Sequence, residues 1–134
     1  MSTQVFINLP VADLSKSVGF FKTLGYSHHP QFTDDTAACI VISDTIHVML
    51  LTHAKFREFT PKAICDTNQS VEMLLCLSCE SRQHVEDLVA KAVAAGGSLY
   101  AQPMDHGFMY QHSFADPDGH HWELVHMSTV PPRQ

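Results

Sequence analysis

Hydrophobic residues recur along this chain at two spacings, one of period two and one of helical period. Alternating positions predict eight strands. The first half holds four of them, at 5–11, 26–33, 36–43 and 45–52. The second half holds the other four, at 71–79, 98–102, 108–115 and 121–127.

Helical spacing predicts two helices, one after the first strand of each half. Asp13 opens the first helix and Gly25 ends it, while Ser81 opens the second and Gly96-Gly97 ends it. Both helices thus have an N-cap residue and a glycine stop. The apolar stripe of the second helix is formed by Val85, Leu88, Val89, Ala92 and Val93.

The predicted order is βαβββ, and it occurs twice, which determines the expected fold. The Asp116-Pro117-Asp118-Gly119 segment predicts a turn that joins the last two strands, because proline presets φ and glycine supplies a positive φ. We expect one α+β domain over residues 1–134, with a first module at about 4–60, a linker at about 61–70 and a second module at about 71–128. The two modules would form a curved mixed sheet around a ligand cavity.

Composition narrows the class of protein. Hydrophobic residues make up 45% of the 134 and charged residues 16%, which is typical of a globular core. Eight basic residues stand against 14 acidic ones, and the net charge of -6 argues against nucleic acid or an anionic membrane as partner. No apolar run approaches the ~20 residues that span a bilayer, and no leader-like segment opens the chain.

The cysteines favour a reducing compartment. All four lie in or beside apolar segments, so we expect free thiols in a cytoplasmic protein. Cys76 and Cys79 spell a C-x-x-C motif, which in principle suits a redox pair or half of a zinc site. Residues three apart on a strand face opposite ways, however, so structural thiols are the favoured interpretation.

The strand faces indicate where chemistry is concentrated. One face of each strand turns to its helix, and the opposite faces mix apolar residues with isolated acids, as in a ligand cavity. Glu72 and Glu123 are single carboxylates with apolar neighbours on such faces. They are candidates for metal ligands or for a general base. The alternative is a solvated edge or a structural pairing with a histidine.

Two further groups are candidates for ligand contact or metal chemistry. Phe108, Tyr110, His112 and Phe114 share a strand face, which predicts an aromatic wall or, equally, packing within the sheet. Ten histidines in 134 residues suggest metal or proton chemistry. Most are expected at the surface, including His120, which follows the predicted turn.

Two segments carry a resemblance to a known superfamily. N-L-P-V-A-D-L-S-K-S-x-x-F-F at 8–21 and F-A-D-P-D-G-H-H-W-E-L at 114–124 resemble the vicinal oxygen chelate superfamily. That superfamily includes glyoxalase I, bleomycin resistance proteins and extradiol dioxygenases. The chain looks most like its glyoxalase-like branch, labelled predicted lactoylglutathione lyase, over about residues 4–128. The resemblance specifies a fold more than a reaction.

The resemblance implies four metal-ligand positions, on the first and last strands of each module. Here they are occupied by Phe6, Met49, Glu72 and Glu123, with Met73 as an alternative to Glu72. The implied metal is a divalent nickel, zinc, manganese or iron ion. Phenylalanine cannot ligate and a thioether is a poor ligand for such cations, so we expect a degenerate site.

The histidines are poorly placed to supply the missing metal ligands. His47 and His53 share the side of Met49, but they lie about 7 and 13 Å from it along a strand at ~3.3 Å per residue. His112 is the only further candidate. None of the ten histidines occupies one of the four ligand positions that the resemblance implies.

Two functions remain open. The first is a small-molecule binder or sequestering protein for a polar or aromatic ligand, which contacts Phe6, Asn8, Met49, Phe108, Tyr110, His112 and Glu123. The second is a metal-dependent lyase or isomerase of glyoxalase type, or a dioxygenase, in which Glu72 and Glu123 are the ligands or catalytic groups. The resemblance also implies a homodimer.

Overall fold

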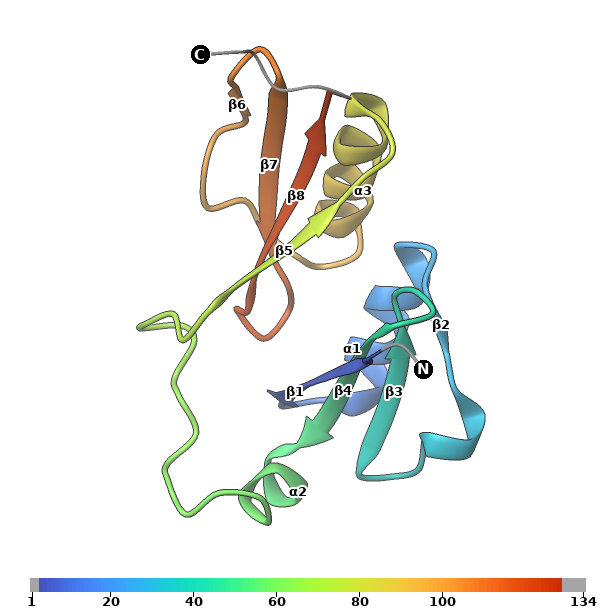
Figure 1. Cartoon of the computed structure of the whole chain (residues 1–134). Helices are drawn as coiled ribbons and strands as arrows, with labels where there is room; N and C mark the ends of the chain where they lie inside the picture. The colour runs from blue at the N-terminus through green and yellow to red at the C-terminus, as the bar shows by residue number, and fades with distance from the viewer. Residues whose placement is uncertain (1–2, 129–134) are drawn as a thin grey trace. The chain divides into compact units, whose positions relative to one another are not determined.

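Two four-stranded sheets, each with a helix packed on it, form this chain (Figure 1). The structure is a computed structural model, and it describes residues 3–128. The chain divides into two compact units, Met1–Cys65 and Asp66–Gln134. The predicted α+β class and the repeated βαβββ order are confirmed. Within the described residues, no helix is long and apolar enough to cross a membrane.

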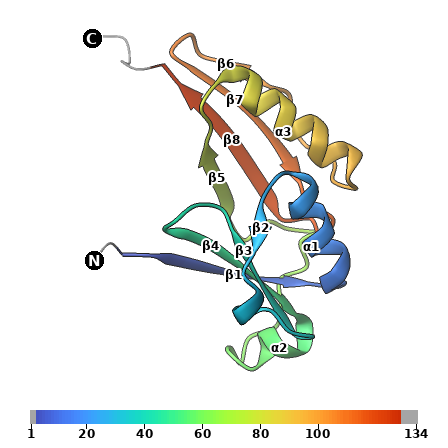
Figure 2. The same ribbon diagram turned by 90° about the vertical axis from the view of Figure 1, so that its right-hand side faces the viewer.

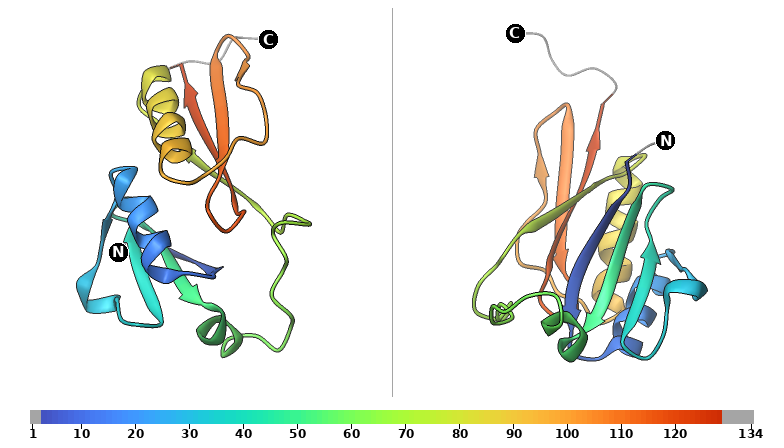
Figure 3. Two further views of the ribbon diagram at one scale, coloured as in Figure 1. Left: turned by 180° about the vertical axis from the view of Figure 1, so that it is seen from behind. Right: turned by 60° about the horizontal axis from the view of Figure 1, so that its bottom comes forward.

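The first unit places a mixed sheet beneath its main helix. Its elements are β1 (Val5–Val11), α1 (Leu14–Thr23), β2 (Ser27–His28), the short 3-10 helix η1 (Pro30–Phe32), β3 (Ala37–Val41), β4 (Ile46–Thr52) and α2 (His53–Arg57). The strand order is β1-β4-β3-β2, with β1 parallel to β4 and the other pairs antiparallel (Figure 3). Phe20 and Phe21 of α1 are buried, as are Leu9, Val48 and Leu50 of the sheet.

The second unit repeats this arrangement with a longer helix. Its elements are β5 (Leu74–Ser78), α3 (Arg82–Ala94), β6 (Met104–Asp105), β7 (Met109–Ala115) and β8 (His121–Met127). The order is β5-β8-β7-β6, with β5 parallel to β8. Helix α3 lies along one face of this sheet (Figure 2). That face buries Trp122 and Leu124 of β8 against the helix.

Both helices begin and end where the sequence predicts. The Asp13 carboxylate accepts a hydrogen bond from the Lys16 backbone N–H at 3.1 Å, and the Ser81 hydroxyl accepts one from the His84 N–H at 3.0 Å. Each side chain thereby satisfies one of the free N–H groups of a first helical turn. Gly25 has a φ of 105°, a left-handed conformation that favours glycine and ends α1.

The turn between β7 and β8 is organised around the buried Asp116 side chain. Its Oδ1 accepts hydrogen bonds from the backbone N–H groups of Asp118 and His120, both at 3.0 Å. Its Oδ2 accepts a third from Trp122 Nε1 at 3.0 Å. Gly119 completes the turn with a φ of 89°, and a Cβ there would come within 2.9 Å of the Thr67 carbonyl oxygen. The predicted hairpin therefore rests on a buried polar network.

Two predicted strands, the second of each module, are wrong in extent. The segment 26–33 forms only the two-residue β2 and then η1, because Pro30 lacks the N–H that a sheet ladder needs. The segment 98–102 contributes a single bridge, Ser98 to Ala115, and the short strand β6 follows it at Met104–Asp105. Alternation alone did not distinguish these irregular segments from strands.

The ends of β4 and β5 also differ from the prediction. His53 is the first residue of α2 rather than a continuation of β4, since the Thr52 hydroxyl caps that helix by accepting from the Lys55 N–H at 3.2 Å. Strand β5 begins at Leu74, so Glu72 precedes the strand. His53 therefore does not share the strand face of Met49.

We predict that Asp116→Ala lowers the free energy of unfolding by about 2–4 kcal/mol, because three donors lose a buried acceptor. Chemical denaturation followed by circular dichroism measures this change. Asp44→Ala is the matched control, since Asp44 is exposed in a turn, and it should change the value by no more than about 0.5 kcal/mol. Equal effects of the two substitutions would contradict a structural role for Asp116.

Candidate functional site

Glu123 lies at the centre of the sheet face that points away from α3, which we call the helix-free face of the second unit. It is in register with Cys76 of β5 on one side and with Ser113 of β7 on the other. Its chain neighbours Trp122 and Leu124 point to the opposite face, where they are buried. A carboxylate, a thiol and a hydroxyl thus form one row across three strands.

Tyr100 adds an aromatic ring to this row, from the irregular segment after α3. The ring stacks on that of His121, with 3.7 Å between centroids and 10° between planes. Burial is the largest cause of a raised pKa of the Tyr100 phenol. A hydrogen bond with Ser113 lowers this pKa, whereas the charges of Glu123 and Cys76 raise it further. The sequence pattern does not single out Tyr100, because only the tertiary contacts of this aperiodic segment bring it to Glu123.

Burial also raises the pKa of the Cys76 thiol, and the negative charge of Glu123 raises it further. Cys79, three residues on, is buried, and burial raises its pKa to about 11. Both are free cysteines, and Cys76 is exposed whereas Cys79 is buried. This arrangement agrees with structural thiols rather than a redox pair.

Glu72 occupies a different setting from Glu123. Its Oε1 lies 3.1 Å from Nδ1 of His120, and the side chains of Glu72 and His120 are 24% and 2% exposed. The expectation that His120 is solvated is therefore wrong. The Asp116 network holds the backbone N–H of His120, and this draws the imidazole inward. Glu72 supplies the polar partner that this buried ring needs, as in the structural alternative considered for it.

The first unit carries an apolar and imidazole surface at the corresponding place. Phe6 stacks on His47 of the neighbouring strand, with 4.6 Å between centroids and 12° between planes. Asn8 donates a hydrogen bond to the Phe6 carbonyl oxygen at 3.2 Å and is in register with Met49. Nδ1 of His47 is buried and has no hydrogen-bond partner in the part of the chain that the structure describes.

These residues do not fit the divalent metal that the resemblance implies. Phe6 has no donor atom, Met49 offers a thioether, and the Glu72 carboxylate is bound to His120. Among residues 3–128, no three or more histidine, cysteine, aspartate or glutamate side chains gather in a way that could hold a metal ion. We therefore derive no chemistry through a metal.

The aromatic residues of β7 lie on the other face of the second unit. Tyr110 and His112 are in register with His126 and Leu124, and they face α3 rather than the side of Glu123. Phe108 directly precedes β7, and Phe114 is buried against Trp122 with 6.4 Å between ring centroids. Tyr110 and His112, which the sequence proposes as contacts of the same ligand as Glu123, thus lie on the opposite face of the sheet from Glu123.

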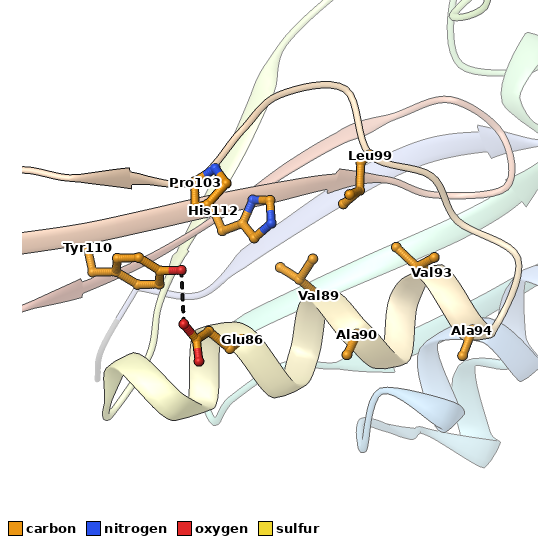
Figure 4. A pocket seen from close by; sticks show the side chains of 9 residues that line it. All are labelled: Glu86, Val89, Ala90, Val93, Ala94, Leu99, Pro103, Tyr110 and His112. Atoms are coloured by element: carbon orange, nitrogen blue, oxygen red, sulfur yellow. Dashed lines mark hydrogen bonds between the residues drawn. The ribbon is translucent and has the colours of Figure 1, made fainter.

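Tyr110 and His112 instead line a groove beside α3 (Figure 4). Its volume is about 590 Å³, and its lining comes from α3, from the segment after that helix and from β7: Glu86, Val89, Ala90, Val93, Ala94, Leu99, Pro103, Tyr110 and His112. The Tyr110 hydroxyl donates to Glu86 Oε1 at 3.2 Å, as the dashed line in the figure shows. We call this cavity the α3 groove.

Charged and imidazole groups surround the polar end of the α3 groove. The Arg82 guanidinium lies 4.1 Å from the centroid of the Tyr110 ring and forms an ion pair with Asp105 at 2.7 Å. Nδ1 of His112 is buried without a hydrogen-bond partner within residues 3–128. Burial lowers the pKa of His112, although the Glu86 charge acts in the opposite direction.

Comparisons with known proteins agree with this geometry. The family model for a bleomycin resistance protein-like N-terminal region matches residues 3–43. A hypothetical protein from S. aureus is 28% identical, with a TM-score of 0.78 and coverage of 93% of this chain and 94% of that one. A glyoxalase/bleomycin resistance protein/dioxygenase family enzyme from Burkholderia phytofirmans is 16% identical, with a TM-score of 0.77 and coverage of 94% and 99%.

A bleomycin resistance determinant encoded on transposon Tn5 is 17% identical, with a TM-score of 0.63 and coverage of 96% and 100%. No curated protein matches the chain significantly. The family model covers the segment that holds the first motif, and the solved structures share the fold over nearly the whole chain. The chain has the fold of the vicinal oxygen chelate superfamily.

We predict that Glu123→Gln speeds alkylation of Cys76, because loss of the adjacent negative charge lowers the pKa of the thiol. The rate with iodoacetamide at about pH 8 should rise by about two- to fivefold, because the thiolate is the reacting form and its fraction grows. Mass spectrometry of the labelled peptides measures it, and Cys65 in the same sample is the internal control. An unchanged Cys76 rate would contradict the predicted adjacency.

We predict that His112 protonates below the ordinary histidine pKa of about 6.5. Burial makes the pKa of His112 lower in the folded than in the unfolded chain. The contribution of the neutral imidazole to stability is therefore complete at a pH above the unfolded-state pKa. It is lost as the pH falls toward the lower pKa of the folded state. Wild type should therefore lose more unfolding free energy than His112→Gln between about pH 7 and pH 5. Denaturant titrations at each pH test this, and parallel curves would contradict it.

Proposed function

We propose that this chain binds a small polar or aromatic molecule on the helix-free face of its second unit, with Glu123 as the charged anchor and without a resident divalent metal. The observation that carries the proposal is the row of Cys76, Glu123 and Ser113 together with the Tyr100 ring. A few placed polar groups beside aromatic surface are typical of small-molecule sites.

The chemistry of the row indicates what the ligand offers. Glu123 is an acceptor when ionised, so it favours a hydroxyl, amide or ammonium donor. The Tyr100 ring and its stacked partner His121 favour a planar group. The first unit by itself carries another planar surface, the stacked Phe6 and His47, and the side chain of Asn8 adds amide hydrogen-bonding groups there.

A binding or sequestering role also agrees with one of the structural neighbours. The determinant from transposon Tn5 is named for bleomycin resistance, and it shares the fold over nearly the whole chain. The metal-dependent lyase, isomerase or dioxygenase alternative needs donor atoms at Phe6 and Met49, which these side chains do not supply. A homodimer, as the resemblance implies, remains part of the proposal.

The metal arm of the test separates the two functions. Purified full-length protein is titrated with nickel, zinc, manganese and iron(II), and bound metal is measured by elemental analysis after desalting. We expect less than one tenth of an equivalent of each ion, because too few donors converge. Stoichiometric metal that is lost in Glu123→Gln would overturn the binder proposal in favour of the metal-dependent enzyme.

The ligand arm tests Glu123 directly. A set of small aromatic compounds that carry hydroxyl or amide donors is screened by saturation-transfer NMR, and the dissociation constants of the hits are measured. Glu123→Gln should weaken the hits by about tenfold, as loss of a charge-assisted hydrogen bond implies. Glu80→Gln, at an exposed position outside the face, is the matched control. Unaltered binding to Glu123→Gln would remove Glu123 from the site.

A further inference from the structure

The α3 groove has the dimensions and composition of a binding site and lies on the opposite face of the second sheet from Glu123. Its volume of about 590 Å³ falls within the ~300–1,000 Å³ of small-molecule pockets. All of its lining residues belong to the second unit, between Glu86 and His112. The groove is therefore formed without any contribution from the first unit.

Apolar side chains form the long part of this groove (Figure 4). Val93 at the end of α3 is 44% exposed, and Leu99 across the groove is 53% exposed. Val89, between them and the polar end, is buried. Val93 belongs to the apolar stripe that the sequence predicts, yet the sheet does not cover it. These walls suit an apolar body of a ligand.

The polar end has an imidazole ring and a negative balance of charge. His112 lines the groove, and its Nδ1 is enclosed by protein without a hydrogen-bond partner within the described residues. Glu86 and Asp105 carry two negative charges, and Arg82 carries a positive charge beside them. Arg82 and Asp105 neutralise each other in an ion pair at 2.7 Å. The remaining charge is that of Glu86, whose Oε1 accepts the Tyr110 hydroxyl.

We propose that the α3 groove is a second small-molecule site, which takes a primary amine with an apolar body. The ammonium group donates to the Glu86 carboxylate, and the body lies along Val93 and Leu99. An ammonium group has three donors and no acceptor, so it matches this carboxylate better than a carboxylate or phosphate ligand would. The proposal does not depend on the role of Glu123.

The experiment uses isotope-labelled full-length protein and three probes that share a phenyl body. They are phenethylamine, its uncharged analogue phenethyl alcohol and the anionic phenylpropionate. We expect phenethylamine to shift the amide resonances of α3 and β7 saturably, with a dissociation constant in the millimolar range typical of so small a ligand. The alcohol should bind about fivefold or more weakly, and the acid should not bind at the same concentration.

Variants locate the binding and separate it from the helix-free face. Glu86→Gln keeps an oxygen to accept the Tyr110 hydroxyl, and it should weaken phenethylamine by about tenfold through loss of the ion pair. Glu80→Gln is the matched control and should leave binding unchanged. Glu123→Gln should also leave it unchanged, so failure of the proposed ligand function at Glu123 would be distinguishable from failure here.

Several results would overturn the proposal. Equal affinities for the amine and the acid would show that no charged head is recognised. Full affinity in Glu86→Gln, or shifts confined to β5 and the Glu123 side of β8, would place the amine elsewhere. Absence of saturable shifts up to about 20 mM phenethylamine, well above the millimolar range expected for such a ligand, would show that the groove does not bind the amine. Shifts of the groove amides with protein concentration alone would instead identify an interface between copies of the chain.

Discussion

The buried carboxylate of Asp116 is the contact on which the second unit depends. A buried carboxylate is costly unless hydrogen-bond donors surround it, and here it accepts from two backbone N–H groups and from the Trp122 indole. The same contacts fix the turn between β7 and β8 and set the direction in which β8 begins. Burial raises the pKa of the Asp116 carboxyl. The nearby His120 and the hydrogen bond from the Trp122 indole oppose this rise.

Two consequences for the candidate chemistry follow from this network. Once Trp122 is held toward α3, the period of two along β8 places Glu123 on the opposite face, beside Cys76 and Ser113. The same turn draws His120 into the interior, where Glu72 becomes its partner. The D-P-D-G-H-H-W-E-L segment is thus mainly architectural, and Glu123 is the member that faces outward into a candidate site.

The strand period also separates two surfaces of different character in the second unit. The helix-free face gathers Glu123, Tyr100 and small polar side chains, whereas the α3 groove gathers aliphatic side chains with an acidic and imidazole end. Each face has its own few polar groups. For this reason the two proposed ligands differ in chemistry and can be tested independently.

The sequence by itself determined the repeated βαβββ order, the ends of α1 and α3, the turn at Asp116 and the alternation that exposes Glu123. All of these depend on residues that are near one another in the chain, such as Asp13 with Lys16 or Ser81 with His84. The sequence also supplied two motifs that point to the fold shared with the solved structures. Local rules were sufficient here because caps, turns and strand periods act over a few residues.

Only the tertiary structure decided which candidate residues meet. Tyr100 reaches Ser113 and Glu123 from an aperiodic segment, Glu72 reaches His120 across 48 positions, and Tyr110 turns to Glu86 instead of joining Glu123. Alternation shows that residues share a face, but it does not show which face a helix covers. That choice is made when α3 packs on the sheet, because only then do buried and open faces differ.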